Sequence, residues 1–420
     1  MRVCMVTYSF YEGDTRVIQY ATALAGRGDQ VDVLALRKEG DARFEILQGV
    51  NVYRIQERQV NETSQFMYLF RILRFLIASA LLLTKNQFIK RYDVIHVHSV
   101  PDFLVFAAIV PKLLGARVIL DIHDILPEFY ASKFGASKDS FLFKSLVWVE
   151  KLSIAFSDHV IIANHLWYDR LLSRSVAAEK CSVVINYPDP KIFAPRAKCP
   201  ADGKFIILYP GSLNHHQGLD VAIGAFARVA GEMPGAEYHI YGEGSTKPAL
   251  IQLASDLGMS DRILFHDALP TEEIAEIMAA SDLAVVPKRA SSGFGNEAAS
   301  TKIMEFMSLG VPLIVSNTKI DTFYHDDTRV RFFESENEAD LGEAMLELWS
   351  DPDLRAQLVA GASQYIEQNS WTVRKLDYLN LVDRLHRPAQ SAGSVSDRRE
   401  PAAGAGATPG AQPVHKISPR

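Results

Sequence analysis

The sequence predicts two α/β units in succession, each with a parallel β-sheet covered by helices. Short apolar runs rich in β-branched residues alternate with helical stretches, which is typical of a sheet buried on both faces. The alternation breaks at a proline-rich segment and then starts again. A chain of 420 residues is also too long for one ordinary core. We therefore expect a first unit at residues 1–190 and a second at residues 191–370.

The first unit opens with the apolar run RVCMVTYSF (residues 2–10), which we expect to form a strand. This run is too short for the apolar core of a signal peptide, so we interpret it as part of the fold. A loop, an amphipathic helix ending near Gly26–Gly28 and the strand VDVLAL (31–36) follow. The later strands expected in this unit are YDVIHVHS (92–99), ARVILDIHD (116–124), DHVIIANH (158–165) and KCSVVINYP (180–188).

The second unit follows the linker NYPDPKIFAPRAKCPADGK (186–204). After it, WTVRKLDYLNLVDRLHR (371–387) has apolar residues at helical spacing. The tail 388–420 has five prolines, four glycines and no aromatic residue, so it cannot bury enough apolar surface and is predicted to be disordered. The strands expected in the second unit are FIILYPGS (205–212), AEYHIYGEG (236–244), DRILFHDA (261–268), DLAVVPK (282–288) and VPLIVS (311–316).

Composition and missing motifs exclude several classes of protein. The net charge of -6 and pI near 6.1 argue against a nucleic-acid partner. Cys4, Cys181 and Cys199 are too scattered for a disulfide framework or a zinc site, which indicates a reducing, cytoplasmic compartment. No GxGxxG follows the first strand and no GxxxxGK[ST] is present. Nicotinamide-dependent dehydrogenases and P-loop kinases are therefore not expected.

Residues 66–92, FMYLFRILRFLIASALLLTKNQFIKRY, are apolar and basic without any acidic residue. The uninterrupted apolar part is about half of what a membrane span needs. One interpretation is an interfacial helix on an anionic bilayer, with cations at the headgroups and Phe and Leu dipping inward. The other is an ordinary core helix flanked by solvated charges. The sequence leaves both open. The cations are Arg71, Arg74, Lys85, Lys90 and Arg91.

The segment GFGNEAASTKIMEFMSLGVPLIVS (293–316) carries two glutamates, Glu297 and Glu305, around the start of a predicted helix. Ser300 is a candidate N-cap, and the exposed N–H groups and macrodipole of such a helix end favour an anion. Gly293 and Gly295 would let the backbone approach a ligand closely. The pair would then bracket a diphosphate, one carboxylate per sugar. Glutamates at this spacing also arise by chance, and Glu305 could be an ordinary solvated residue.

The Glu-x7-Glu spacing with EFMSLGVPLIVS resembles the retaining glycosyltransferases of the GT-B fold, specifically glycosyltransferase family 4. The resemblance extends to about residue 387. It includes GDTRVIQYATALAGRGDQVDV (13–33), DVIHVHS (93–99), DIHDILPE (121–128), YPGSLNHHQGLDVAIGAFARV (209–229) and HIYGEG (239–244). It implies two Rossmann-like lobes whose parallel sheets face across a cleft, with helix 371–387 returning to the first lobe.

The resemblance also implies roles for individual residues. Glu297 would hold the donor sugar, and His123 would lie near that sugar and the reacting centre. Glu305 would hold the ribose of the nucleotide. Residues implied on the diphosphate and nucleotide are Thr301, Lys302, Gly293, Gly295, Gly211, Ser212, Gln217 and Gly242, and those implied on the acceptor side are Gly13, Asp14, Thr15 and Arg16.

One departure from the family pattern concerns the pyrophosphate. Ser212 and Gln217 stand where the family usually has basic residues. The charge on a leaving diphosphate must be neutralised for the glycosidic bond to break. The substitutes that the sequence offers are Lys288, Arg289 and Lys302, and our hypothesis is that Lys288 or Lys302 does this work.

The reaction implied is transfer from a UDP- or GDP-sugar with retention, the departing phosphate taking the acceptor proton. The implied acceptor is a polyprenyl-diphosphate-linked saccharide at the cytoplasmic membrane face, in polysaccharide or O-antigen assembly. No cofactor and no metal are expected, because His96–His98 and His215–His216 lack a third ligand at local spacing. Two alternatives stay open: a nucleotide-sugar epimerase on the same architecture, and a catalytically silent nucleotide-binding scaffold.

Overall fold

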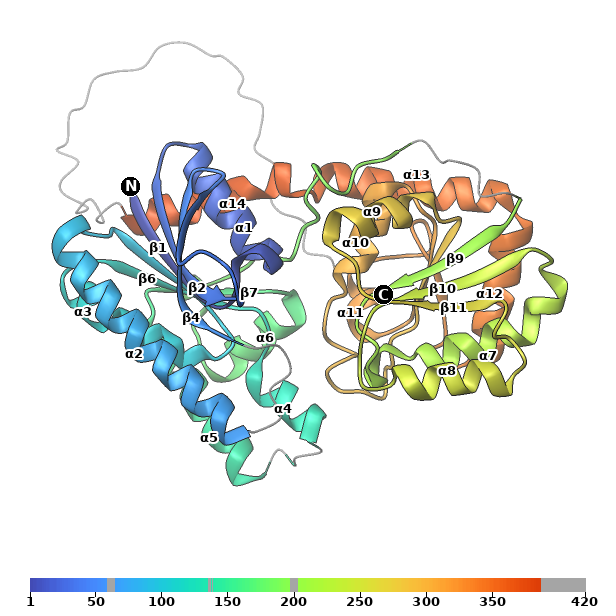
Figure 1. The fold of residues 1–420 in the computed structure, drawn as a ribbon, viewed down its shortest axis with the longest axis horizontal. Helices are drawn as coiled ribbons and strands as arrows, with labels where there is room; N and C mark the ends of the chain where they lie inside the picture. The colour runs from blue at the N-terminus through green and yellow to red at the C-terminus, as the bar shows by residue number, and fades with distance from the viewer. Residues whose placement is uncertain (59–64, 135–136, 138, 197–202, 387–420) are drawn as a thin grey trace, which may run out of the picture. The chain divides into compact units, whose positions relative to one another are not determined.

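The computed structural model describes residues 1–58, 65–134, 137, 139–196 and 203–386. Of these, Met1–His386 belong to one compact unit. The tail 388–420, for which disorder is predicted, lies outside the described residues, as do residues 197–202 of the predicted linker. The two predicted α/β lobes are both present, so the predicted fold class is confirmed (Figure 1).

The first lobe is built on an eight-stranded sheet in the order β3-β4-β2-β1-β5-β6-β7-β8. All neighbouring strands are parallel except β3 and β4, which form a hairpin that the sequence analysis did not anticipate. Every residue of β5 and β7 is buried, as expected for central strands covered on both faces. The strands are β1 (Arg2–Phe10), β2 (Gln30–Arg37), β3 (Phe44–Leu47), β4 (Val50–Glu57), β5 (Val94–His98), β6 (Arg117–Ile122), β7 (His159–Ile162) and β8 (Cys181–Val183).

Helices cover the two faces of this sheet with separate apolar cores. One core joins the sheet to α2, α6 and the 3-10 segment η2, and the other joins it to α1 and the last helix, α14. The helical elements of this lobe are η1 (Tyr11–Gly13), α1 (Thr15–Gly26), α2 (Gln65–Lys90), η2 (Asp102–Ala108), α3 (Ile109–Leu113), α4 (Leu126–Phe134), α5 (Phe141–Phe156), α6 (His165–Arg174) and η3 (Ala178–Lys180).

The second lobe has a six-stranded, all-parallel sheet in the order β11-β10-β9-β12-β13-β14. Its strands are β9 (Phe205–Pro210), β10 (Ala236–Tyr241), β11 (Ile263–His266), β12 (Leu283–Val286), β13 (Leu313–Ser316) and β14 (Arg331–Phe333). Its helical elements are η4 (His215–Gln217), α7 (Leu219–Val229), η5 (Ala230–Glu232), α8 (Lys247–Asp256), α9 (Thr271–Ala280), α10 (Thr301–Leu309), α11 (Lys319–Tyr324), α12 (Glu338–Ser350) and α13 (Pro352–Gln368).

The last helix, α14 (Trp371–His386), lies against α1 of the first lobe (Figure 1). The rings of Tyr378 and Tyr20 stack with their centroids 4.1 Å apart. The Tyr378 hydroxyl lies 3.0 Å from His96 Nδ1, and Arg27 pairs with Asp383 at 2.9 Å. The chain therefore crosses from the second lobe back to the first before the described part ends.

The predicted basic, apolar segment forms α2, which is 26 residues long. Ile72, Phe75 and Leu83 on one side of it are buried in the core of the first lobe. By length and composition alone, Met67–Lys90 could cross a membrane, with a mean hydropathy of 1.7 and 22% of that window buried. The core interpretation thus accounts for one side of this helix, while the other side stays exposed and apolar.

Candidate active site

The first two strands of the second lobe end in tight turns at Gly211 and Gly242. Their φ angles are 140° and 141°, a region that side chains rarely adopt. A Cβ on Gly242 would lie 1.9 Å from the Gly211 carbonyl oxygen, and one on Gly211 would lie 2.4 Å from Lys302 Cε. Glycine at both positions therefore lets the two turns and the Lys302 side chain pack together at the carboxyl edge of the sheet.

A cavity of about 460 Å³ opens at this edge. Parallel α/β sheets bind ligands at this place, where strands end and helices begin. Thr301, Lys302 and Glu305 from the first turns of α10 form part of the lining, together with the two glycine turns. The full lining is Thr15, Phe193, Pro210, Gly211, Ser212, Tyr241, Gly242, Glu243, Ala268, Leu269, Thr271, Ile274, Met278, Thr301, Lys302 and Glu305.

The N-terminus of α10 has unsatisfied hydrogen-bonding groups. Ser300 occupies the predicted N-cap position, but its side chain makes no capping hydrogen bond. Its Oγ is buried and has no partner within the described residues. The first N–H groups of a helix need acceptors from outside the helix, and an anion satisfies them well. The local structure is therefore compatible with a phosphate group, and phosphate binding at this helix end stays a prediction.

The three candidate cations for the diphosphate have different partners in the structure. Lys288 is buried, pairs with Asp321 at 2.8 Å and donates to the Ala298 carbonyl oxygen at 2.8 Å. Lys302 lies over the Tyr209 ring and lines the cavity, and no carboxylate of the described residues lies within ion-pair distance of it. Arg289 is the third, and it is held by two carboxylates, those of Asp220 and Glu336.

Lys302 and Glu305 change each other's titration. Burial lowers the pKa of Lys302, and the nearby Glu305 carboxylate opposes that shift. Burial raises the pKa of Glu305, while Lys302 and a hydrogen bond from Thr301 oppose it. A ligand with both a diphosphate and ribose hydroxyls would supply a counter-charge to Lys302 and hydrogen-bond donors to Glu305.

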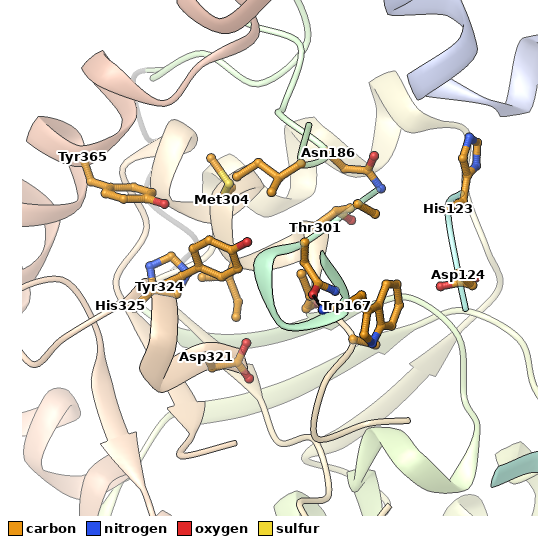
Figure 2. Close-up of a pocket in the computed structure, with 17 residues that line it drawn as sticks. His123, Asp124, Trp167, Asn186, Thr301, Met304, Asp321, Tyr324, His325 and Tyr365 are labelled. Carbon is orange, nitrogen blue, oxygen red and sulfur yellow. Dashed lines mark hydrogen bonds between the residues drawn. The ribbon is translucent and has the colours of Figure 1, made fainter. Parts of the chain in front are cut away.

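A second, smaller cavity of about 80 Å³ lies on the other side of Thr301, which lines both (Figure 2). His123 and Asp124 lie at one end of it and Tyr365 and His325 at the other. Both lobes contribute: the lining residues are His123, Asp124, Ala163, Asn164, Trp167, Ile185 and Asn186 from the first, and Ala298, Ala299, Ser300, Thr301, Ile303, Met304, Asp321, Tyr324, His325 and Tyr365 from the second.

His123 is held by a buried carboxylate. Its Nε2 lies 3.1 Å from Asp121 Oδ2, and Asp121 also accepts two hydrogen bonds of 2.7 Å from Arg16. His98 Nδ1 lies 3.1 Å from the same Asp121 oxygen and 3.3 Å from His123 Nε2. The predicted donor-side histidine is thus the partly exposed end of a buried, hydrogen-bonded network.

The charges in this network oppose the effects of burial. Burial would raise the pKa of Asp121, but Arg16 and His123 hold it well below its usual range. Burial would lower the pKa of His123, but Asp121 raises it above the ordinary value. Burial, with a contribution from His123, lowers the pKa of His98 despite its contact with Asp121. Asp121 therefore shifts the titration of His123 toward higher pH, next to the smaller cavity.

Glu297 lines neither cavity. Its carboxylate accepts two hydrogen bonds from Arg170 of α6, at 2.7 Å and 2.5 Å, and lies 3.5 Å from Lys319 Nζ. Asn164 donates to the Glu297 carbonyl oxygen at 3.1 Å. Of the two predicted glutamates, Glu305 lines the larger cavity, whereas Glu297 is paired with Arg170 of the first lobe. The role of Glu297 on the donor sugar stays a prediction, and it requires that the Glu297 carboxylate leave Arg170.

Gly293, Gly295 and Gln217 also lie outside the two cavity linings. Gly295 is buried in its own loop, where a Cβ would lie 2.9 Å from the Arg289 carbonyl oxygen. Gln217 is buried, its Nε2 lies 3.0 Å from His216 Nε2, and its Oε1 has no partner in the described part of the chain. The loop around the two glycines is held by Phe294, which packs on Phe129, Trp167 and His216.

The predicted acceptor-side segment surrounds the start of α1. Gly13 and Thr15 are exposed, and Asp14 caps α1 by accepting from Val17 N at 3.2 Å. Thr15 lines the larger cavity. Arg16 is buried and engaged with Asp121, so it supports the His123 network instead of presenting a free charge. Contact of these residues with an acceptor stays a prediction.

Sequence reasoning missed several residues of the smaller cavity. Asp124, Asn164 and Asn186 follow the strands β6, β7 and β8, so their position after consecutive parallel strands was the available signal.

The sequence also did not reveal that Asp121 lies beside His96 and His98. The candidate ligand atoms of these three residues lie within 4.8 Å of one another. Arg16 already neutralises that carboxylate. The absence of a required metal stays a prediction.

Two family models match the chain, one per lobe. The model described as glycosyl transferase 4-like domain matches residues 13–186, and the one described as glycosyl transferases group 1 matches residues 192–365. The two-lobed fold is that of the GT-B glycosyltransferases, and each lobe matches a model of glycosyl transferase sequences. The second matched region contains the larger cavity's glycine turns and α10, and the first contains His123.

Curated relatives are glycosyltransferases of low identity. A D-inositol 3-phosphate glycosyltransferase from Stackebrandtia nassauensis is 26% identical over 273 residues, covering 60% of this chain and 59% of the relative. An alpha-D-kanosaminyltransferase from Streptomyces kanamyceticus is 21% identical over 268 residues, covering 60% and 66%. The chain spans about half of the length of several of the relatives that it matches.

Solved structures share the fold over most of the chain. Sucrose-phosphate synthase from Thermosynechococcus elongatus has a TM-score of 0.73 at 17% identity, covering 92% of this chain and 99% of that one. Anabaena HepE in complex with UDP-glucose has a TM-score of 0.67 at 16% identity, covering 91% and 100%. At these identities the likeness establishes the fold alone.

Proposed function

We propose that this glycosyltransferase moves a sugar from a nucleotide-sugar donor to a lipid-linked saccharide, with retention at the anomeric carbon. The observation that carries the donor class is the larger cavity, where the N-terminus of α10, which has no side-chain cap, meets Lys302 beside two glycine turns. Among the described residues, Lys302 has no ion-pair partner. Backbone N–H groups and a cation at one place are what a diphosphate requires.

The donor would extend through both cavities. Its diphosphate would lie at the start of α10, and its ribose would bond Glu305 within the larger cavity. The sugar would lie past Thr301 and face the end of the smaller cavity where His123 lies. The structural neighbour HepE holds UDP-glucose, which supports a UDP-sugar as the first donor to test.

Bond cleavage would leave the nucleoside diphosphate as the departing group and an oxocarbenium-like sugar. Lys302 and the α10 N–H groups would neutralise the charge that develops on the phosphate. The acceptor hydroxyl would attack from the same face, and the departing phosphate would take its proton. His123 would support the donor sugar by hydrogen bonding instead of acting as a general base, because Asp121 raises its pKa and so disfavours loss of its proton.

Two kinds of molecule are candidates for the acceptor. A lipid-linked saccharide in cell-surface polysaccharide assembly agrees with the apolar, basic helix α2 of the first lobe. The relatives named D-inositol 3-phosphate glycosyltransferases favour a soluble phosphorylated polyol as the second candidate. Both acceptors carry phosphate, so the reaction product must be identified.

Donor binding would be tested first, by thermal shift with UDP, GDP and a panel of their sugars. We expect one nucleotide sugar to raise the melting temperature, because a ligand at 100 times its Kd stabilises the folded state by about 2.7 kcal/mol. Glu305→Ala should weaken binding at least tenfold, whereas Glu276→Ala, at an exposed position of α9, should not. No stabilisation by any nucleotide would refute the donor site.

Transfer would then be followed with labelled donor in the presence of a lipid extract or of inositol phosphate. Label in the lipid fraction supports the proposal, and label on inositol phosphate supports the second candidate. Isomerised donor without transfer would indicate an epimerase. Binding without any turnover, for every acceptor offered, would indicate a silent scaffold.

A further inference from the structure

The first lobe has an exposed apolar face on the helices α2, α3 and α5, which we name the three-helix face. We propose that it docks on the surface of an anionic lipid bilayer. The helix α3 packs on α2, and η2 contacts α2, α3 and α5, so η2 joins the three helices on the first lobe (Figure 1). The bilayer is a partner in addition to the donor and acceptor of the proposed function. The biological reason for docking rests on the proposed lipid-linked acceptor, whereas the docking itself can be tested without it.

The three-helix face gathers most of the exposed apolar side chains of the described residues. Fifteen of the twenty-three large apolar side chains that are exposed lie on it or at its edge. Exposed apolar side chains gathered on neighbouring elements are a feature of interaction sites. The fifteen are Met67, Leu69, Phe70, Leu73, Ile77, Leu81, Phe88, Ile89, Ile109, Leu113, Leu114, Phe141, Leu142, Trp148 and Leu152.

This exposure does not come from poorly packed helices. Ile72, Phe75 and Leu83 of α2 are at most 3% exposed, and they follow each other at helical spacing on the side that faces the sheet. Leu73 and Ile77 are four residues apart and so lie on one side of the helix, next to the buried side. They are 42% and 59% exposed. The sequence therefore supplies a second apolar side to a helix whose first apolar side is already buried.

The charge on the three helices has a single sign at the surface. The one acidic residue in α2, α3 or α5 is Glu150, which is 1% exposed and paired with Arg174 at 2.5 Å. Asp139, in the loop before α5, is exposed and lies 3.9 Å from Lys144. The exposed cations on these helices are Arg74, Lys85, Lys144 and Lys151. Apolar side chains with cations around them fit a membrane surface with anionic headgroups.

Aromatic residues lie where an interface would need them. Phe141 at the start of α5 is 88% exposed, Trp148 two turns later is 63% exposed and Phe88 near the end of α2 is 69% exposed. Tryptophan and phenylalanine beside lysines are typical of helices that lie in the interfacial plane of a bilayer. Trp148 also provides a spectroscopic probe of insertion.

The same observations disfavour two other arrangements of the three-helix face, namely a contact with a second copy of the chain and a membrane-spanning α2. A symmetric contact between two copies of this face would place the exposed cations of both copies, Arg74 and Lys85 among them, in one interface without an exposed acidic residue of these helices to pair with them. A spanning arrangement would require α2 to leave the lobe and expose Ile72, Phe75 and Leu83. A helix that keeps its core contacts can lie on a membrane but cannot cross it.

Flotation of the full chain with vesicles tests the proposal. We expect binding to vesicles of phosphatidylcholine with 30% phosphatidylglycerol and at least tenfold weaker binding to phosphatidylcholine alone, with the difference falling as salt is raised. The double variant Phe141→Ser/Trp148→Ser should lose at least tenfold in partition. The control Ile251→Ser/Leu257→Ser removes exposed apolar side chains from the second lobe and should not change it.

Tryptophan fluorescence gives an independent readout. Anionic vesicles should shift the emission to the blue, and Trp148→Phe should remove most of this shift while keeping flotation within twofold. Binding that ignores phosphatidylglycerol, or that survives Phe141→Ser/Trp148→Ser, would overturn the proposal. A concentration-dependent dimer abolished by the same double variant would assign the face to a second copy instead.

Failure of docking and failure of the proposed function can be told apart. The docking variants should keep the thermal shift caused by the nucleotide sugar, because their changes lie outside both cavities. Loss of vesicle binding with donor binding intact counts only against the membrane surface. Loss of donor binding in the wild-type chain, with vesicle binding intact, counts only against the proposed reaction.

Discussion

The Asp121 carboxylate accepts two hydrogen bonds of 2.7 Å from the Arg16 guanidinium, and both side chains are at most 5% exposed. The same carboxylate lies 3.1 Å from His123 Nε2. One buried acidic group therefore joins the start of α1, β6 and the histidine next to the smaller cavity.

Asp121→Asn should lower both the stability of the chain and the pKa of His123. Removing one partner of a buried ion pair costs about 3 to 5 kcal/mol, because Arg16 keeps its buried charge. His123 would lose the carboxylate that raises its pKa, so its titration should move to lower pH. Urea unfolding measures the first effect, and NMR titration of the His123 ring measures the second.

The matched control is Asp383→Asn, which breaks the pair with Arg27. Asp383 is 42% exposed, so its loss should cost no more than about 1 kcal/mol. An unchanged His123 titration in Asp121→Asn would mean that the carboxylate does not control this histidine.

Lys302→Met and Lys288→Met should have different effects. Lys302→Met should reduce kcat at least tenfold with little change in melting temperature, because Lys302 lines the larger cavity without an ion-pair partner among the described residues. Lys288→Met should destabilise the fold by a few kcal/mol by leaving Asp321 buried and unpaired.

Lys38→Met, at an exposed lysine of the first lobe, is the control for both. Steady-state kinetics and thermal unfolding of the three variants separate the roles, and a kcat within tenfold of wild type for Lys302→Met would exclude it as the diphosphate cation.

Arg170→Gln should tighten donor binding if Glu297 contacts the donor sugar. The Glu297 carboxylate must leave Arg170 to reach the sugar, and a partly exposed ion pair of about 1 kcal/mol corresponds to about fivefold in Kd. Glu297→Gln should instead reduce turnover at least a hundredfold. Calorimetric titration of the donor into Arg170→Gln checks the first expectation.

The neighbouring arginine provides the comparison. Arg174 contacts Glu128 and Glu150 but not Glu297, so Arg174→Gln should leave donor affinity unchanged unless the fold is disturbed. Weaker donor binding in Arg170→Gln would show that Arg170 itself contacts the donor, and that its pairing with Glu297 is not a competing state.

Stability should fall as the pH is lowered from 6.5 to 4, in part through His159. Burial, followed by the charges of Arg384 and Lys180, lowers the pKa of His159 to about 4. In this window the unfolded chain binds a proton at this position and the folded chain does not, so protonation favours unfolding by roughly 2 to 4 kcal/mol. His159→Gln should remove that part of the pH dependence in urea unfolding, whereas a change at exposed His215 should not. An identical pH profile for wild type and His159→Gln would contradict the assignment.

The sequence was informative wherever structure depends on neighbouring residues. The apolar runs predicted most strands of both sheets, and TKIMEFMSLG predicted α10, which ends in the left-handed Gly310 as expected for a helix terminus. The β3–β4 hairpin was missed, since its strands are partly exposed and lack a continuous buried run. The departure of Ser212 and Gln217 from the family pattern was also visible in the sequence and directed attention to Lys302.

The tertiary structure alone decided which charged groups are paired and which remain available to a ligand. Arg16 meets Asp121 across 105 residues of sequence, and Arg170 meets Glu297 across 127. Periodicity and capping are properties of neighbouring residues, so a sequence displays them directly. The partner of a charge depends on how distant strands and helices are brought together, and so does the side of a helix that remains exposed. For this reason the sequence predicted two α/β lobes and a candidate phosphate-binding helix end, while the fold determined that Lys302 has no ion-pair partner among the described residues and that α2 keeps an uncovered apolar side.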